Sequence, residues 1–257
     1  MWTHIDSDSS DGNQLDLYER NGVYMIRANG WELMNGEYHA SEDQLGRLAG
    51  LLAGAPGAEI LVGGLGLGYT LASLLETLNQ GIGLTEARVT VAERSGAVLR
   101  WFDTHISRRL MAARSLGVCL VESDVADHLG VDRQWNVIVL DVDNGPQALS
   151  NPGNAMLYGE HGLARCRDSL APSGHLLLWA GFEDPSFIDR ARAAGFSATQ
   201  QTVPFQVRPD QTHVLYVLSC QPIPARDCDR FGLVTSGGNI KPPTIHPPPS
   251  THSTSAP

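Results

Sequence analysis

The central part of the chain alternates short apolar runs with longer amphipathic segments. Apolar runs of strand length lie at residues 60–62, 87–93, 118–123 and 136–141, and a helix is expected from about Thr70. Strands that alternate with helices in this way are typical of βαβ units, which build a parallel sheet covered by helices. The pattern therefore predicts a doubly wound α/β fold.

Segments near both ends of the chain have the sequence pattern of antiparallel strands. Residues 14–39 alternate apolar and polar positions around Asn-Gly pairs at 21–22 and 29–30, a pattern typical of hairpins. Residues 196–203 and 213–220 form a second pair of strand-like runs joined by a short polar loop. We predict a mostly parallel seven-stranded sheet with an antiparallel C-terminal hairpin, preceded by a small N-terminal antiparallel β module.

Two further helices and a late strand complete the pattern. Ser41 is expected to cap a helix that buries Leu45, Leu48, Leu51 and Leu52. A helix from about Gly159 to Leu170 and an Ala-Pro-Ser-Gly turn precede a strand at 175–180. We divide the chain into four parts. These are a disordered segment (residues 1–13), the N-terminal β module (14–40), the main domain (41–222) and a C-terminal extension (223–257). The Pro/Ser/Thr-rich part of this extension is expected to be disordered from about 237.

A glycine-rich turn follows the first central strand. Gly64, Gly66 and Gly68 let the backbone turn sharply and approach a ligand, and the N-terminus of the next helix points to the same place. The segment predicts a nucleotide cradle, although a tight turn without a ligand has the same sequence signal.

Carboxylates close the next three strands. Glu93 lies 25 positions after Gly68, where two carboxylate oxygens can accept hydrogen bonds from ribose hydroxyls. A dinucleotide fingerprint would place its third glycine at position 69, which is Tyr69. An adenosyl ligand is therefore favoured over a dinucleotide.

The other two strand ends carry Asp124 and Asp141. Asp124 suits a helix cap and a ligand contact equally well. Asp141 closes an almost wholly apolar strand, and burying its charge is unfavourable unless it faces a polar site. Asp143 follows directly, in a segment that also suits a turn before Pro146.

The charge and residue composition of the chain limit the classes of ligand and partner that we expect it to bind. The chain has 257 residues, a net charge of −10 and 18 basic residues that do not cluster, which argues against nucleic acid and suits a cationic substrate such as a polyamine. The four cysteines lack metal-ligand spacing, so we expect no metal and free thiols, with Cys119 and Cys220 buried in strands. With no targeting signal or membrane-length apolar run, we expect a cytoplasmic protein without a membrane contact.

The assembled pattern resembles the spermidine synthase family, specifically its bacterial spermidine-synthase-like branch. The resemblance covers roughly residues 14–221 and rests on GGLGLG at 63–68, Glu93, Asp124, the LDVDNGP loop, the Leu-Tyr pair at 157–158 and ELMNGEYHASEDQL. It implies the class I S-adenosylmethionine-dependent methyltransferase fold. It also implies that Glu93 holds the ribose, that Asp124 receives the adenine amino group, and that Asp141 is the catalytic aspartate, with Asp143 as a second acid near the acceptor.

One position departs from the family pattern. Polyamine synthases usually carry GGGDGG here, so their aspartate aligns with Gly66. That aspartate faces the free amine of decarboxylated S-adenosylmethionine and would repel the carboxylate of the intact donor. With Gly66 this repulsion is absent, and backbone N–H groups of the turn can accommodate a carboxylate.

The sequence signal for residues that would contact the acceptor is less specific than the signal for the donor site. Tyr38, His39, Glu42 and Tyr158 are the candidate acceptor contacts, with packing and turn roles equally open for Tyr38 and His39, and Trp31 is a further wall candidate. Trp179 and Trp135 are expected to pack in the core or at its edge.

We expect a transferase that moves a methyl or aminopropyl-type group from S-adenosylmethionine, intact rather than decarboxylated, to a small-molecule amine. A polyamine aminopropyltransferase that uses the decarboxylated donor, a non-catalytic nucleotide-binding protein and, more distantly, an NAD-dependent oxidoreductase remain alternatives. A homodimer stays open as the assembly.

Overall fold

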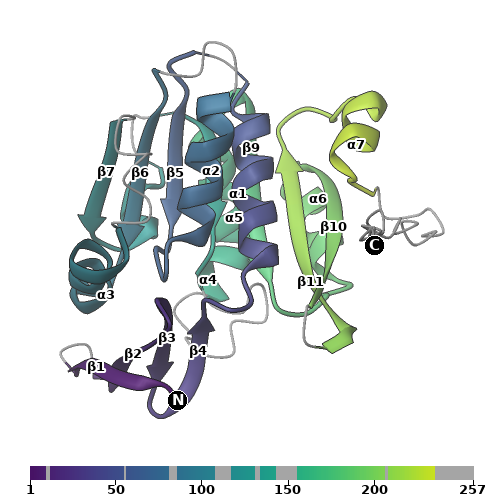
Figure 1. Cartoon of the computed structure of the whole chain (residues 1–257). Coiled ribbons are helices and arrows are strands. Elements are labelled where there is room, and N and C mark those ends of the chain that lie inside the picture. Colours follow the sequence, from purple (N-terminus) through teal and green to yellow (C-terminus); the bar gives the residue numbers. More distant parts are fainter. Residues whose placement is uncertain are drawn as a thin grey trace, which may run out of the picture.

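The computed structural model describes residues 1–9, 12–54, 56–80, 86–107, 117–130, 134–142, 155–205 and 208–234. These residues form two sheets, a four-stranded antiparallel one at the N-terminus and a seven-stranded one in the main domain (Figure 1). The predicted fold class is confirmed.

The N-terminal sheet is a simple meander. Its strands, in the order β1-β2-β3-β4, are β1 (Thr3–Asp8), β2 (Leu15–Arg20), β3 (Val23–Ala28) and β4 (Trp31–Asn35). Both Asn-Gly pairs form the predicted turns, with positive φ at Asn21 (52°) and at Asn29 (51°) and at the glycine that follows each. These turns fix the register that presents β4 to the main domain.

The predicted disorder of residues 1–13 is wrong for Thr3–Asp8, which form β1. This polar strand has little apolar surface of its own, so its sequence gives a weak strand signal. Two side chains tie it to α3 (Gly96–Trp101). Asp6 accepts a hydrogen bond from the indole nitrogen of Trp101 at 2.7 Å, and Asp8 pairs with Arg100 at 2.8 Å. Contacts with a distant helix therefore order a strand that the local pattern does not reveal.

The main sheet has the order β10-β11-β9-β8-β5-β6-β7. Its strands are β5 (Glu59–Gly63), β6 (Arg88–Glu93), β7 (Gly117–Glu122), β8 (Trp135–Leu140), β9 (Leu170–Ala180), β10 (Ser197–Phe205) and β11 (Arg208–Ser219). The strands from β9 to β7 are parallel, and β11 and β10 add the predicted antiparallel hairpin. The predicted Ala-Pro-Ser-Gly turn instead lies within β9, where a register shift between Trp135 and Val137 marks its pairing with β8.

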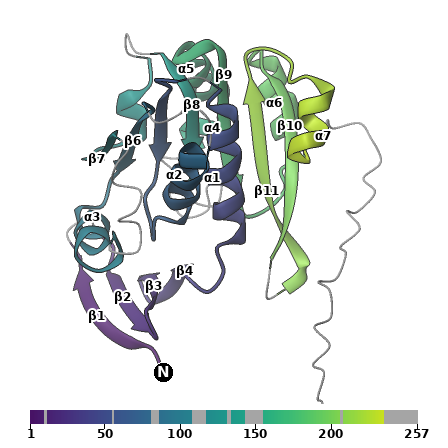
Figure 2. The ribbon, with the colours of Figure 1, turned by 45° about the horizontal axis from the view of Figure 1, so that its top comes forward.

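Helices cover both faces of this sheet. The helices are α1 (Ala40–Leu52), α2 (Tyr69–Gln80), α3, α4 (Ala155–Tyr158), α5 (Glu160–Asp168), α6 (Phe187–Ala193) and α7 (Ala225–Phe231). A π-helical turn, Phe102–Ile106, follows α3, and a 3-10 turn, Val125–His128, follows β7. In Figure 2, α1 and α2 lie on one face of the sheet and α5 and α6 on the other.

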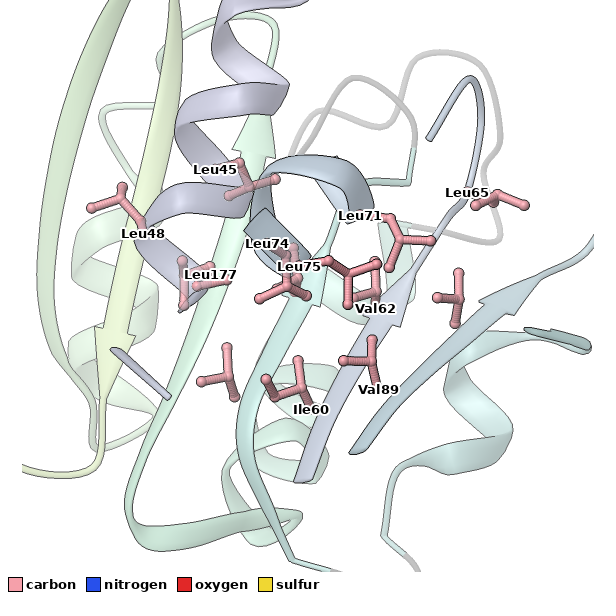
Figure 3. Packing of buried hydrophobic residues seen from close by; sticks show 14 of the residues in the cluster. Leu45, Leu48, Ile60, Val62, Leu65, Leu71, Leu74, Leu75, Val89 and Leu177 are labelled. Carbon is pink, nitrogen blue, oxygen red and sulfur yellow. The ribbon is translucent and has the colours of Figure 1, made fainter. Parts of the chain in front are cut away.

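Successive side chains of β5 point to opposite faces of the sheet and pack against the helices on each face. Ile60 and Val62 point to the α1 and α2 side, where they pack with Leu45, Leu74 and Leu75 (Figure 3). Leu61 points to the opposite side and packs with Leu163 of α5 and Ile188 of α6. This double burial explains why β5 reads as a continuous apolar run.

Ser41 does not cap α1. The helix begins at Ala40, the N-cap residue His39 makes no side-chain hydrogen bond to the helix, and Ser41 lies inside the first turn. Its hydroxyl instead contacts Glu42 and His213. A side-chain partner from β11 has thus replaced the local backbone bond that the sequence pattern predicts.

The C-terminal extension contributes to the core. Cys228, Phe231 and Leu233 are buried against the α1 side of the sheet, and Val234 pairs with Gln200 of β10. The segment from residue 237, predicted to be disordered, lies outside the described residues. All four cysteines are free, as predicted. Cys119 is exposed rather than buried, because β7 is the edge strand, and Cys220 is half-buried and directly follows β11 instead of lying in a strand.

Within the described ranges, the model contains no helix of the length and apolar character that a membrane crossing requires.

Candidate functional site

One cavity lies where the carboxyl ends of β5, β6 and β8 face the N-terminal sheet. Its volume is about 460 Å³. Four carboxylates line it, namely Glu42, Glu93, Asp124 and Asp141, together with the glycine loop 64–68 and Thr70. Apolar side chains from the N-terminal sheet, among them Leu15, Ile26, Leu33 and Met34, close the opposite wall. The strand ends predicted to carry ligand contacts therefore converge on one site.

The glycine loop connects β5 to α2 with a conformation that glycine favours. Gly64, Gly66 and Gly68 have φ values of 88°, 50° and 80°. A Cβ atom on Gly64 would lie 2.2 Å from the backbone oxygen of Asp141, so this turn packs directly on the end of β8. The close approach holds the loop and Asp141 in one rigid unit.

Met34 covers the middle of the loop. A Cβ atom on Gly66 would lie 2.3 Å from the sulfur of Met34. The space that a side chain at position 66 would enter is therefore occupied by a thioether from β4. This contact has no local sequence signal, because Met34 belongs to the N-terminal sheet and Gly66 to the loop after β5.

Glu93 is held by backbone donors on both of its oxygens. The N–H of Leu65 donates to Oε2 at 2.9 Å, and the N–H of Ser95 donates to Oε1 at 2.8 Å. Each carboxylate oxygen retains a further lone pair, and the side chain lines the cavity. The geometry thus presents an oriented acceptor pair of the kind that vicinal hydroxyls require.

Asp124 caps a turn and also lines the cavity. Its Oδ1 accepts a hydrogen bond from the N–H of Ala126 at 2.9 Å and so caps the 3-10 turn. The same side chain lines the cavity, with Oδ2 at 3.8 Å from Nε of Arg94. A carboxylate can cap with one oxygen and present the other to a ligand.

Asp141 is the most perturbed acid of the cavity. Burial raises its pKa from 3.8 to about 7, and the nearby Glu42 carboxylate adds to this rise. The hydroxyl of Thr70, 2.6 Å from Oδ2, stabilises the charged form and opposes it. An acid with a pKa near neutrality in a cavity is suited to exchange a proton with a ligand.

Glu42 is the second acid on this side of the cavity. Burial raises its pKa above the usual range, and the Ser41 hydroxyl, 2.5 Å from Oε2, partly offsets the rise. Glu42 belongs to α1, whereas Asp141 ends β8, so the packing of α1 on α2 brings the two acids to one wall. In their ionised forms, two carboxylates placed in this way would attract a cation.

The other predicted acceptor contacts lie elsewhere among the described residues. His39 stacks on Tyr69 with 3.8 Å between ring centroids and pairs with Asp43 at 2.7 Å, and Tyr38 packs edge-on against Phe205. Tyr158 is buried, and its hydroxyl donates to the backbone oxygen of Val142 at 3.0 Å, which supports the residue after Asp141. None of the three lines the cavity.

The predictions for three tryptophans can be compared with the structure, whereas the prediction for Asp143 cannot. Asp143 lies outside the described residues. Trp31 does not line the cavity and is 82% exposed. Trp135 is fully buried as predicted. Trp179 packs, half-buried, against the core as predicted, and it also forms part of the cavity wall.

Sequence reasoning did not identify Thr70, Met34 and Trp179 as residues of the cavity wall. Thr70 had a usable signal, because it stands two positions after Gly68, in the first turn of a helix that faces the site. Trp179 is the penultimate residue of β9 and lies at the same edge of the sheet. The indole Nε1 of Trp179 is buried and has no hydrogen-bond partner within the described part of the chain.

The described residues fit an adenosyl sulfonium ligand. The loop leaves no room for a Cβ at Gly64, the Glu93 carboxylate is oriented for hydroxyls, and Asp124 supplies an acceptor at the next strand end. Across the described ranges, no group of three or more His, Cys, Asp or Glu side chains is arranged to hold a metal ion.

Comparison with known proteins gives structural likeness without sequence likeness. No protein-family model matches the chain, and no curated protein matches its sequence. A spermidine synthase in complex with the transition state analogue AdoDATO is similar at a TM-score of 0.64 and 17% identity, covering 87% of this chain and 74% of that one. The spermidine synthase from Thermotoga maritima is similar at 0.67 and 16%, with the same coverage.

A methyltransferase shares part of the architecture. The Burkholderia thailandensis 1,6-didemethyltoxoflavin-N1-methyltransferase, solved with S-adenosylhomocysteine, is similar at a TM-score of 0.50 and 19% identity, covering 70% of this chain and 78% of that one. At these identities the likeness concerns the fold. The chain has the Rossmann-like α/β fold of spermidine synthases and class I methyltransferases, with an N-terminal β-sheet placed over the carboxyl edge of the main sheet.

Proposed function

We propose that this protein is a transferase that moves a methyl or aminopropyl-type group from an adenosyl sulfonium donor to a small amine. The observation that carries the proposal is the convergence of Glu93, Asp124 and Asp141 with the glycine loop around one cavity. Two of these acids are suited to a nucleoside, and the third has the pKa of a base.

The donor would be held by residues whose geometry is already set. Glu93 would accept from the ribose hydroxyls and Asp124 from the adenine amino group, because both carboxylates are fixed by backbone donors and retain free lone pairs. When bound, the donor supplies an activated carbon next to a sulfonium. Most of the rate enhancement would then come from holding the two reactants in line.

Asp141 would act on the amine. A protonated amine is not a nucleophile, so its proton must leave before attack. The carboxylates of Asp141 and Glu42 would attract the ammonium group, and Asp141, with a pKa of about 7, would take the proton near neutral pH. The Thr70 hydroxyl would keep the Asp141 carboxylate oriented during this exchange.

Intact S-adenosylmethionine is the donor that the loop favours. Position 66 offers no acidic side chain, and the Met34 thioether occupies the adjacent space. The backbone of the loop can therefore accommodate a carboxylate without a charge conflict at this residue.

The acidic character of the cavity favours a second candidate. Four carboxylates in the wall suit ligands rich in positive charge. Decarboxylated S-adenosylmethionine with a polyamine acceptor is such a pair, and the two spermidine synthases of similar fold agree with it.

Calorimetric titration with S-adenosylmethionine, its decarboxylated form and methylthioadenosine tests the donor. We expect the intact donor to bind most tightly and Glu93→Gln to weaken all three about tenfold, the loss of one charge-assisted hydrogen bond. Tighter binding of the decarboxylated donor would support the second candidate. Binding of none of the three would point to a different class of protein.

Transfer is tested separately by incubating each donor that binds with putrescine, spermidine or 1,3-diaminopropane and following the alkylated amine by mass spectrometry. We expect Asp141→Asn to bind the donor like the wild type and to lose turnover by about a hundredfold or more. Donor binding without transfer to any amine would favour the non-catalytic alternative.

A further inference from the structure

We propose that Ser41 and His213 form a proton relay that connects Glu42, in the wall of the cavity, with the surface of the protein. The proposal rests on the transfer to an amine proposed above and names the route by which the released proton leaves. Ser41 and His213 are positioning residues in this scheme, because neither lines the cavity.

The relay consists of two short contacts between three side chains. Oγ of Ser41 lies 2.5 Å from Oε2 of Glu42 and 2.7 Å from Nδ1 of His213. Ser41 is 3% exposed, so both contacts are shielded from bulk water. His213 belongs to β11, 172 positions away in the sequence, and is half-buried, so part of this residue contacts solvent. The three groups thus lead from the cavity toward the outside.

A hydroxyl has one proton and two lone pairs, so these contacts allow two arrangements. With Glu42 ionised, Ser41 donates to Glu42 and accepts from the Nδ1–H of His213. With Glu42 protonated, Glu42 donates to Ser41, and Ser41 donates to a bare Nδ1. The direction of both hydrogen bonds therefore follows the charge of Glu42.

The proposed reaction releases one proton per turnover. An ammonium group and a sulfonium enter, and a thioether and an alkylated ammonium leave, so one positive charge departs as a proton. This proton passes from the amine to the carboxylates of the wall. The O–H bond of Glu42 then breaks as a new O–H forms on Ser41, the original Ser41 proton moves to Nδ1 of His213, and the imidazolium loses its Nε2 proton to water.

Aromatic contacts hold the imidazole in place. Trp179 meets the His213 ring edge-on with 4.8 Å between centroids, and Phe205 lies at 5.1 Å. Burial lowers the pKa of His213, so the ring releases a proton readily near neutrality. The charged groups acting on Glu42 are His39 and Asp43 of its own helix and Asp141 across the cavity.

The same contacts also tie α1 to the antiparallel hairpin, and a second tie provides the control. Gln44, one turn further along α1, donates from Nε2 to Oε1 of Gln201 on β10 at 2.8 Å. Gln44→Ala removes a helix-to-strand tie of similar kind without touching the relay. A purely structural role of Ser41 would make Ser41→Ala and Gln44→Ala behave alike.

The first test needs no substrate. Nuclear magnetic resonance of the ¹⁵N-labelled imidazole follows the proton positions of His213 with pH, and ¹³C resonances of the glutamate carboxyls follow Glu42. We expect the His213 resonances to show an inflection at the pH where Glu42 titrates, and to lose it in Ser41→Ala and in Glu42→Gln but not in Gln44→Ala. A His213 titration identical in wild type and Ser41→Ala would overturn the relay.

The second test is kinetic and uses the donor and amine that give turnover. We expect His213→Ala to lower kcat by on the order of tenfold or more with little change in KM, and imidazole in solution to restore part of it. Gln44→Ala should keep the wild-type pH profile. An unchanged kcat in His213→Ala would also overturn the relay, whereas an absence of turnover in the wild type contradicts the proposed function and leaves the resonance experiment to decide.

Discussion

The hydroxyl of Thr70 lies 2.6 Å from Oδ2 of Asp141 and 3.3 Å from the backbone oxygen of Glu42. One side chain from the first turn of α2 therefore connects the end of β8 with the start of α1. The two acids of the acceptor wall belong to different elements, and Thr70 joins these elements at the site.

Thr70→Val removes the hydrogen bond that favours the ionised form of Asp141. The pKa of Asp141 should rise further, because burial and Glu42 then act without opposition. We expect the midpoint of the rise of kcat/KM with pH to move up by about one pH unit, the effect of a hydrogen bond to a charged group. Thr70→Ser retains the hydroxyl and should keep the wild-type profile. An unchanged midpoint in Thr70→Val would show that another group controls it.

Asp141 should make the stability of the protein depend on pH. Its pKa is 3.8 in the unfolded chain and about 7 in the fold, so the folded protein holds an extra proton between these values. The free energy of unfolding therefore falls as pH rises from about 4 to about 7 and is constant for this group above that range.

Asp141→Asn removes this dependence. We expect the variant to be more stable than the wild type at pH 8 by about 2 to 4 kcal/mol and similar to it at pH 4, where both side chains are neutral. Urea unfolding at several pH values measures the difference. Equal stability of the two proteins at both pH values would show that Asp141 titrates near its usual pKa.

Gly66→Asp tests the role of the loop in donor choice. The residue has φ of 50°, which aspartate tolerates, and its side chain would displace the flexible end of Met34. We expect a loss of stability of about 1 kcal/mol and a change of about tenfold in relative affinity toward the decarboxylated donor.

Gly66→Asn has the same shape without the charge and is the matched control. It should share the loss of stability but not the change in preference. Calorimetry with both donors distinguishes the two effects, and an equal change in preference in both variants would assign it to the displacement of Met34. Met34→Ala in the Gly66→Asp background should recover part of the lost stability.

Gly46→Ala tests the contact between α1 and α2. A Cβ atom at position 46 would lie 2.2 Å from the backbone oxygen of Thr70 and 2.8 Å from the backbone nitrogen of Leu74. Backbone atoms cannot rotate away, so α1 must move. We expect a destabilisation of about 2 to 3 kcal/mol in urea unfolding and weaker amine binding, because Glu42 moves away from Asp141.

Gly117→Ala is the control for the added methyl group. At this position in β7 the nearest atom to a Cβ is Cγ of Arg88 at 3.8 Å, an ordinary contact. Its stability should stay within about 1 kcal/mol of the wild type. Equal losses in the two variants would mean that the close packing of α1 on α2 is not the cause.

Much of the donor side of the site could be predicted from local sequence. Gly64, Glu93, Asp124 and Asp141 follow apolar runs, and parallel strands bring their carboxyl ends to one edge. The order of the strands was not needed for this inference. The pattern of strands and turns was enough to gather these residues.

The acceptor side could not be predicted in the same way. Tyr38 and His39 stand close to Glu42 in sequence, yet only Glu42, in the first turn of α1, lines the cavity. Tyr38 and His39 precede this turn, and their rings pack against Phe205 and Tyr69. Local composition does not distinguish these directions.

The α/β fold, the Asn-Gly hairpins and the acids at the strand ends follow from the sequence, because each depends on periodicity or on one turn. Only the folded chain shows that Met34 covers Gly66, that Ser41 contacts His213 instead of capping its helix, and that β1 forms against α3. These contacts join residues far apart in the chain, and their free energy comes from packing between elements rather than from local propensity.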